Sequence, residues 1–327
     1  MSFKEVKGHE HQIEHLRRAI ESERMSHAYL FAGLEGIGKR LVAQSFAQAI
    51  NCRELPGEGC GVCTPCKKIN QQIHPDCMYI EAEGNSIKID QIRDLQKRMT
   101  FHPFEGRKKI IIINDAEKMT PQAANCLLRS LEEPLLDTVF IIITHELRTL
   151  LPTIVSRCQM IRFQPLSSQV IQKMVEERFQ GREVVTDVLV SLSGGSLKRA
   201  FEMVESGLVF DRAMLFDRVK RLSQEGISSA LNLAEELTSA KEDMAEKLEL
   251  LKTWYHDFMV CKRRELKDRV VNSDLLEKIE KESSTFTLEE LLAKWKVVKE
   301  AQLLMKRNVN PQLIVDYMLI KLAAKEG

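Results

Sequence analysis

A glycine-rich loop between an apolar run and a helical pattern constrains the fold of this chain most strongly. Residues 27–32 are mostly apolar, residues 33–40 read Gly-Leu-Glu-Gly-Ile-Gly-Lys-Arg, and a helical pattern follows over residues 41–50. This order nearly fits G-x-x-x-x-G-K-[ST], in which backbone N–H groups and a helix N-terminus bind phosphate while the lysine pairs with its oxygens. The loop therefore predicts a nucleotide site lined by Gly33, Gly36, Gly38 and Lys39.

The first half of the chain alternates strand-like runs with amphipathic stretches. Because helical crossovers join parallel strands and cover both faces of the sheet, such strands are almost continuously apolar. The pattern predicts an α/β domain with a parallel sheet. The expected strands are Ala28 to Ala32, Met78 to Ile80, Lys109 to Ile113, Val139 to Thr144 and Gln159 to Phe163.

The second half of the chain carries only helical patterns. A chain of 327 residues exceeds what one core usually organises. We expect an α/β domain over residues 1–165, a small helical domain over 166–207 and an all-helical domain over 208–327. The expected helices are Val170 to Phe179, Glu183 to Leu192, Leu197 to Glu205, Ile227 to Leu237, Met244 to Lys262, Leu288 to Leu304 and Pro311 to Ala324.

Charge and hydropathy exclude several classes of protein. The chain has 48 basic and 47 acidic residues, which argues against wrapping of nucleic acid by this chain alone. No apolar run approaches the roughly 20 residues that cross a bilayer, so no membrane span is expected. The charged start of the sequence lacks a signal-peptide core, and a cytoplasmic location is expected.

At two positions the residues differ from those that an active ATPase of this kind carries. Arg40 replaces the serine or threonine that ligates Mg²⁺, and arginine cannot ligate a metal. After the third expected strand, Asn114 and Asp115 stand where such ATPases place Asp and then Glu. An arginine at 40 and the loss of a carboxylate at 114 together shift the local charge by two positive units, each worth on the order of 4 kcal/mol at about 4 Å and an effective dielectric near 20. We expect no hydrolysis, and weak or absent ATP or ADP binding, unless Asp115 supplies the missing carboxylate.

Four cysteines follow the loop helix closely. Cys52, Cys60, Cys63 and Cys66 have the spacing C-x7-C-x2-C-x2-C. Four thiolates in a glycine- and proline-containing loop suit a closed, structural Zn²⁺ site, so a zinc module is expected over residues 52–66. An iron–sulfur cluster is the alternative, but its next cysteine would stand where Asn70 is. Unligated thiols are the other alternative.

Further motifs resemble the AAA+ clamp-loader family. Residues 124–134 read Ala-Asn-Cys-Leu-Leu-Arg-Ser-Leu-Glu-Glu-Pro, and residues 156–158 read Ser-Arg-Cys. Both patterns are specific to that family, and the resemblance covers residues 6–200 with a compatible helical tail. It implies an AAA+ phosphate-loop domain, a small helical lid and a C-terminal helical collar.

The resemblance also implies residue roles. Arg157 matches an arginine finger, which acts in trans on the ATP of a neighbouring subunit; a surface arginine at a helix end is the alternative. A guanidinium suits this role because it stays ionised and offers forked donors to phosphate oxygens. Thr144 matches a polar sensor after the fourth strand. Lys198 matches a second sensor that is usually arginine.

Two branches of the family are candidates. One is the gamma/tau-like ATPase motor; the other is the delta-prime branch, which keeps the finger while its own pocket is often degraded. An intact Ser-Arg-Cys beside the changes at 40 and 114 favours delta-prime. The resemblance then implies a non-motor subunit of the DNA polymerase III holoenzyme in a hetero-oligomeric ring. Expected partners are the clamp-loader ATPase subunits and delta, and, through the complex, the sliding clamp and primer-template DNA.

Overall fold

The fold comes from a computed structural model, which describes residues 2–134, 137–180, 186–239, 244–263, 269–305, 307 and 309–324. Its contacts divide the chain into two compact units. The first comprises Met1–Ile171 with Gly195–Lys198, and the second comprises Gln172–Gly194 with Arg199–Gly327. Each unit has its own core.

A five-stranded parallel sheet forms the centre of the first unit. Its strand order is β2-β3-β4-β1-β5, so β1 lies between β4 and β5 and β2 is an edge strand. Ala28 pairs with Phe140, and Tyr29 pairs with Gln159. Loops after the carboxyl ends of such strands commonly bind ligands. The strands are β1 (Ala28–Ala32), β2 (Cys77–Ile80), β3 (Lys109–Ile113), β4 (Thr138–Thr144) and β5 (Gln159–Arg162).

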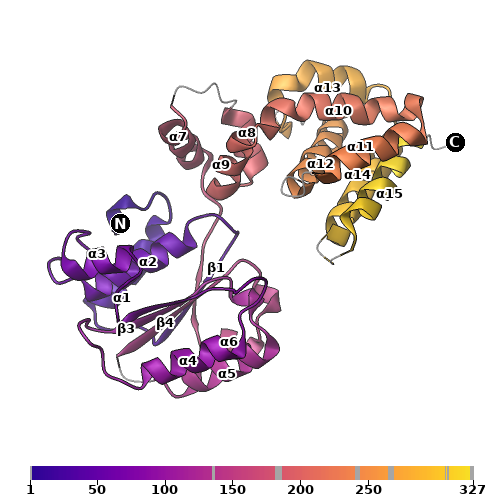
Figure 1. The fold of residues 1–327 in the computed structure, drawn as a ribbon. Coiled ribbons are helices and arrows are strands. Elements are labelled where there is room, and N and C mark those ends of the chain that lie inside the picture. The colour runs from indigo at the N-terminus through magenta and orange to yellow at the C-terminus, as the bar shows by residue number, and fades with distance from the viewer. Residues whose placement is uncertain are drawn as a thin grey trace. The chain divides into compact units, whose positions relative to one another are not determined.

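Helices cover both faces of this sheet, with α1–α3 on one side and α4–α6 on the other (Figure 1). The α-helices are α1 (Glu10–Glu21), α2 (Lys39–Asn51), α3 (Thr64–Asn70), α4 (Ile89–Met99), α5 (Pro121–Glu132) and α6 (Pro152–Val155). Short 3-10 helices are η1 (Phe3–Glu5), η2 (Ala116–Lys118) and η3 (Leu147–Thr149).

Successive side chains of each strand point to opposite faces of the sheet, so each face has its own hydrophobic core. Ile111 and Phe140 pack in the cluster that also contains Leu95 of α4 and Leu127 of α5. On the other face, Tyr29 meets Phe46 of α2 edge to face, with ring centroids 5.3 Å apart. Since β1, β3 and β4 are buried along their whole lengths, the loops after them start from fixed positions.

The second unit is built from helices, and two of its helices, α7 and α9, begin in the first unit. The helices are α7 (Ser168–Arg178), α8 (Thr186–Ser193), α9 (Leu197–Glu205), α10 (Leu208–Glu225), α11 (Ile227–Ser239), α12 (Met244–Cys261), η6 (Ser273–Leu275), α13 (Leu276–Ser283), α14 (Leu288–Met305) and α15 (Pro311–Ala323).

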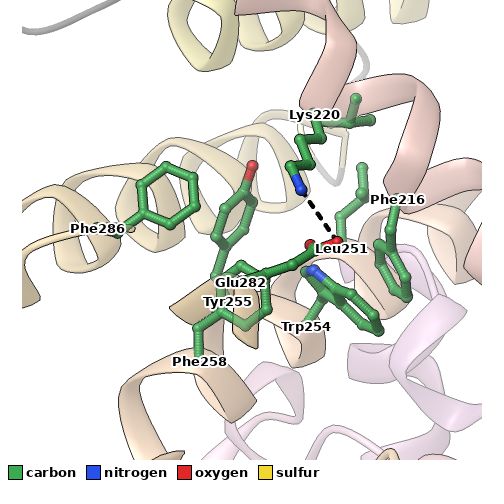
Figure 2. A pocket seen from close by; sticks show the side chains of 9 residues that line it. Phe216, Lys220, Leu251, Trp254, Tyr255, Phe258, Glu282 and Phe286 are labelled. Atoms are coloured by element: carbon green, nitrogen blue, oxygen red, sulfur yellow. Dashed lines mark ion pairs between the residues drawn. The ribbon is translucent and has the colours of Figure 1, made fainter. Parts of the chain in front are cut away.

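Aromatic residues organise part of this second core (Figure 2). The rings of Phe216 and Trp254 stack with centroids 3.6 Å apart, and Trp254 also contacts Phe258. Lys220 and Glu282 form an ion pair of 3.1 Å at the rim of a cavity of about 30 Å³. Such a cavity holds about one or two water molecules, so it belongs to the packing of the core.

The predicted fold class is confirmed. All five strands lie where the sequence placed them, within one residue at each end. The sequence did not predict α10 or α13, and the start of the helix expected at Glu183 lies outside the described residues. The boundaries at 165/166 and 207/208 stay a prediction. None of the helices that the structure describes is long and apolar enough to span a membrane.

Candidate functional site

The phosphate-loop signature follows β1 and leads directly into α2. Gly36 and Gly38 have positive φ values of 74° and 100°, which favour glycine. A Cβ on Gly33 would approach the Phe163 carbonyl oxygen to 2.5 Å, so this position also needs glycine. Because Gly38 is the N-cap of α2, the loop sits at the N-terminus of that helix, where anions bind favourably.

Lys39 is buried within this loop, only 6% exposed. Its ammonium donates hydrogen bonds to the carbonyl oxygens of Gly33 and Leu34, at 2.7 and 2.5 Å. Burial lowers the pKa of Lys39, while the charges of Glu117 and other nearby carboxylates oppose that shift. The structure therefore places a lysine ammonium inside the glycine loop.

Arg40 turns towards the end of β2. One of its guanidinium nitrogens lies 2.5 Å from Glu81 Oε1, and both side chains are partly exposed. Asn114 follows β3 and continues the sheet, donating its backbone N–H to the Ile80 carbonyl at 2.9 Å. The added charge of Arg40 is thus offset by Glu81. The missing metal ligands at 40 and 114 are not replaced by this pairing.

A polar cluster lies beyond the ends of β3 and β4. Glu117 Oε2 accepts a hydrogen bond of 2.7 Å from the Thr144 hydroxyl, and its Oε1 lies 2.6 Å from His145 Nδ1. Asp115 has a left-handed φ of 49° and pairs with Lys118 at 3.1 Å. The predicted sensor Thr144 is therefore engaged by a carboxylate of its own chain.

The segment 195–198 packs against the glycine loop. Lys198 donates its backbone N–H to the Gly36 carbonyl at 3.1 Å, and its ammonium lies 2.7 Å from Glu35 Oε1. The hydrogen bond from Lys198 lowers the pKa of Glu35. Ser196 donates to the Glu35 carbonyl at 2.8 Å. A Cβ on Gly36 would lie 2.4 Å from Lys198 Cβ, so this close approach also requires glycine.

Arg157 lies at the end of the sheet where the strands begin, whereas the glycine loop lies at the end where they finish. Arg157 follows α6 and precedes the amino end of β5, and the loop follows the carboxyl end of β1. Its guanidinium is 2.7 Å from Glu132 Oε1, at the end of α5, and donates to the Thr153 carbonyl at 3.1 Å. The two ends are separated by the length of β1, roughly 13 Å at about 3.3 Å per residue.

The four clustered cysteines converge in space. Their sulfur atoms all lie within 4.8 Å of one another, so the residues could hold a metal ion. The Sγ–Sγ distances are 3.8 Å for Cys52 and Cys63 and 4.0 Å for Cys60 and Cys66. Sulfurs about 2.3 Å from a tetrahedral zinc would be about 3.8 Å apart, so the donor set fits this metal. The backbone N–H groups of Leu55 and Cys60 point at the Cys52 sulfur, at 3.2 and 3.3 Å.

Side chains of α2 hold the cysteine loop against the first unit. Gln44 donates to the Ile69 carbonyl at 3.1 Å, and Gln48 donates to the Cys66 carbonyl at 3.4 Å. Cys52 caps the same helix at its C-terminus. The helix that begins in the phosphate loop thus ends in the cysteine cluster, and the two sites share one rigid element.

Comparison with known proteins decides the family. Residues 8–167 match the family described as DNA polymerase III, delta subunit, and residues 207–324 match its C-terminal family. The chain is 32% identical to DNA polymerase III subunit delta' of Bacillus subtilis, with 94% of each chain covered. The chain belongs to the delta-prime subunit family of DNA polymerase III. The delta' of Pseudomonas aeruginosa is 31% identical, over 92% of this chain and 93% of its own.

The delta-prime family membership confirms the branch expected from the sequence. The tau subunit of Bacillus subtilis is 31% identical to this chain, over 80% of this chain, but the match covers only 50% of tau. The delta-prime relatives are instead matched over nearly their whole lengths. The protein is thus a delta-prime subunit of the clamp loader by family, with tau and gamma/tau subunits as further relatives.

The sequence did not point to three polar residues around the glycine loop of this delta-prime subunit. Glu81 follows β2, Glu117 lies in η2 after β3, and His145 follows β4. Their common signal is their position after the carboxyl ends of parallel strands, where side chains from separate segments converge. The local charge expected from positions 40 and 114 alone therefore did not include the nearby carboxylates of Glu81 and Glu117.

Proposed function

We propose that this chain serves its clamp loader by supplying Arg157 as an arginine finger to the ATP site of a neighbouring motor subunit. Its own nucleotide site does not hydrolyse ATP. The chain acts in the cytoplasm within a hetero-oligomeric ring of motor ATPase and delta subunits, and it reaches the sliding clamp and primer-template DNA through that complex.

The position of Arg157 is the main support for this proposal. Because it lies at the amino edge of the sheet, it cannot reach phosphates held at the carboxyl edge of the same sheet. Its side chain is 35% exposed and its Glu132 partner 49% exposed. An ion pair this exposed contributes only about 0–1 kcal/mol, so Arg157 can exchange Glu132 for a phosphate of another subunit at little cost.

The chemistry at positions 40 and 114 supports the loss of hydrolysis. Mg²⁺ prefers oxygen ligands at near-octahedral geometry, and neither a guanidinium nor a neutral amide provides a charged oxygen. The pairing of Arg40 with Glu81 offsets the added positive charge. It does not supply the magnesium ligands that are missing at positions 40 and 114. Lys39, Thr144 and Lys198 are each bound by groups of this chain, which a phosphate would have to displace, so weak nucleotide binding without hydrolysis is the outcome we propose.

Zinc is the metal we propose for the four-cysteine site. Four sulfur donors at tetrahedral spacing select zinc among common intracellular divalent metals, and a closed shell leaves no position for catalysis. Cys52, Cys60, Cys63 and Cys66 would hold the ion and fix the loop between α2 and α3. The ion's contribution is structural.

Single-turnover hydrolysis in the reconstituted clamp loader tests the finger. Arg157→Ala should leave ATP binding by the motor subunits unchanged and slow hydrolysis at the site it serves by roughly 10³-fold or more. Arg157→Lys should recover little, because an ammonium lacks the planar fork. Unchanged hydrolysis at every motor site in the Arg157→Ala complex would refute the assignment.

A further inference from the structure

The loop between α4 and β3 presents two aromatic side chains to solvent. Phe101 is 74% exposed and Phe104 is 84% exposed. Ile73, which is also exposed, lines the same hollow of about 870 Å³ beside them. Single exposed apolar residues are ordinary, but several together on one surface mark sites of interaction. We call residues 101–104 with Ile73 the Phe101–Phe104 surface.

Buried charged residues hold this surface in place. Lys109 is 4% exposed, and its ammonium donates to the carbonyl oxygens of Arg98, Met99 and Phe101. It therefore fixes the end of α4 and the start of the loop. Burying a charge is costly unless it is fully hydrogen-bonded, and here the bonds go to backbone that carries Phe101.

Asp76 fixes the other end of the loop. It is 2% exposed and accepts backbone hydrogen bonds from Phe104, Glu105 and Gly106, at 2.7, 2.9 and 2.8 Å. A Cβ on Gly106 would lie 3.2 Å from Asp76 Oδ2 and 3.0 Å from Asn51 Oδ1. Two buried charges thus hold a short loop whose aromatic side chains face outward, and a preorganised loop loses little entropy when it binds.

The charges around the surface select an acidic partner. Lys97, Arg98 and His102 are exposed and line the hollow, whereas the carboxylate that lines it, Asp76, is buried and already bound by backbone N–H groups. Lys97 also pairs with Asp94, at 2.8 Å. The lining therefore presents basic groups and no exposed carboxylate to an incoming molecule.

A protein fits this surface better than single-stranded nucleic acid. Non-specific nucleic-acid sites follow the phosphate backbone with a row of cations, and here Lys97 and Arg98 would neutralise at most two phosphates. Exposed aromatic side chains beside an arginine are instead typical anchors of protein interfaces. The hollow also runs along β2, the edge strand of the sheet.

We propose that the Phe101–Phe104 surface docks a partner protein that offers an apolar pocket rimmed by carboxylates. Phe101 and Phe104 enter the pocket, and Arg98 faces the acidic rim. This inference is independent of the proposed role of Arg157, because the two involve separate loops of the first unit.

Hydroxyl-radical footprinting of full-length protein tests this proposal. Oxidation of Phe101 and Phe104 is compared in the chain alone, in the assembled clamp loader, and in the clamp loader with sliding clamp, each with and without oligo(dT). The proposal expects oxidation of both residues to fall at least fivefold when one protein component is added. Equal oxidation in all states, or protection by oligo(dT) alone, overturns it.

Matched variants then connect protection to binding. Phe101→Ala and Phe104→Ala should each weaken the association with the protecting protein by tenfold or more. Met214→Ala, which shortens an exposed apolar side chain of the second unit, should not change it. Since both phenylalanines are exposed, retention of the wild-type melting temperature would show that the variants fold. Unchanged affinity of the phenylalanine variants contradicts the proposal.

Discussion

The guanidinium of Arg157 rests 2.7 Å from Glu132, and so joins the Ser-Arg-Cys segment to the end of the Leu-Glu-Glu-Pro helix. The arginine lies at the amino ends of the strands, whereas its own phosphate loop follows the carboxyl end of β1. Two motifs that stand 25 positions apart in the sequence therefore form a single structural unit. That unit can present a cation to another subunit.

Glu132→Gln tests whether the contact positions the finger. Glu132 holds Arg157 only until the arginine turns to the phosphate, so removing the carboxylate charge gives the free arginine more rotamers to lose, and hydrolysis by the reconstituted complex should slow by about 2- to 5-fold. Steady-state ATP turnover with DNA and clamp provides the measurement. Glu133→Gln, at the neighbouring position, serves as the matched control. A Glu132→Gln complex as fast as wild type would show that the contact is incidental.

Restoring the metal ligands should restore magnesium-dependent nucleotide binding. Arg40→Thr with Asn114→Asp supplies a hydroxyl and a carboxylate, removes one positive charge and adds one negative charge, so affinity for Mg·ATP should rise at least tenfold, or about 1.4 kcal/mol. Titration of a fluorescent ATP analogue with and without Mg²⁺ measures the change. Arg40→Gln removes the charge without adding a hydroxyl and should recover less. Tight Mg·ATP binding by the unaltered chain would contradict the account of this pocket.

The cysteine site should contain stoichiometric zinc in protein purified without chelators. Cys63→Ser should lose the metal and lower the melting temperature of the first unit, because metal binding contributes to its folding free energy. Metal analysis and calorimetry provide the two readouts. Cys126→Ser removes a half-buried thiol outside the cluster and should keep the zinc. Iron with a visible absorbance band, or no metal at all, would exclude the zinc assignment.

His9 should make the stability of the phosphate loop depend on pH. Its ring is buried and lies 2.7 Å, through Nε2, from the Ile37 carbonyl, and burial is the largest cause that lowers its pKa from 6.5. The unfolded chain therefore takes up the proton first, so the contribution of His9 is complete above about pH 6.5 and is lost as the pH falls towards the folded value.

Urea unfolding at pH 8 and pH 5.5 measures this effect of His9. His9→Asn replaces the ring N–H by an amide N–H donor and tolerates the left-handed φ of 65°, but it takes up no proton. The wild type should therefore lose more stability than the variant over this interval. An equal loss in both proteins would place the pH dependence in other groups.

The strands were predictable because each is a short apolar run next to a turn signal. Ile110 to Ile113 are nearly fully buried, as expected for a strand covered on both faces. The helix α10 was not among the expected helices, although polar and apolar residues separate in it at least as clearly as in α12, α14 and α15, which were expected. Helices of this kind are stabilised by tertiary packing, which a local pattern does not contain.

The candidate sites differed in how much the sequence could reveal. The four cysteines lie within 15 positions of one another, so local spacing indicated their convergence. The Arg40 pair with Glu81 and the Thr144 hydrogen bond to Glu117 join residues that are far apart in the sequence. Their pairing depends on the order of the strands, which sequence periodicity alone does not determine.

We propose that this subunit acts through Arg157 and does not need ATP hydrolysis at Lys39. The most direct measurement compares clamp-loading ATP turnover in complexes that carry Lys39→Ala, Arg157→Ala or both. We expect near wild-type turnover with Lys39→Ala, a large loss with Arg157→Ala, and no further loss in the double variant. Loss of turnover with Lys39→Ala and full turnover with Arg157→Ala would contradict this proposal.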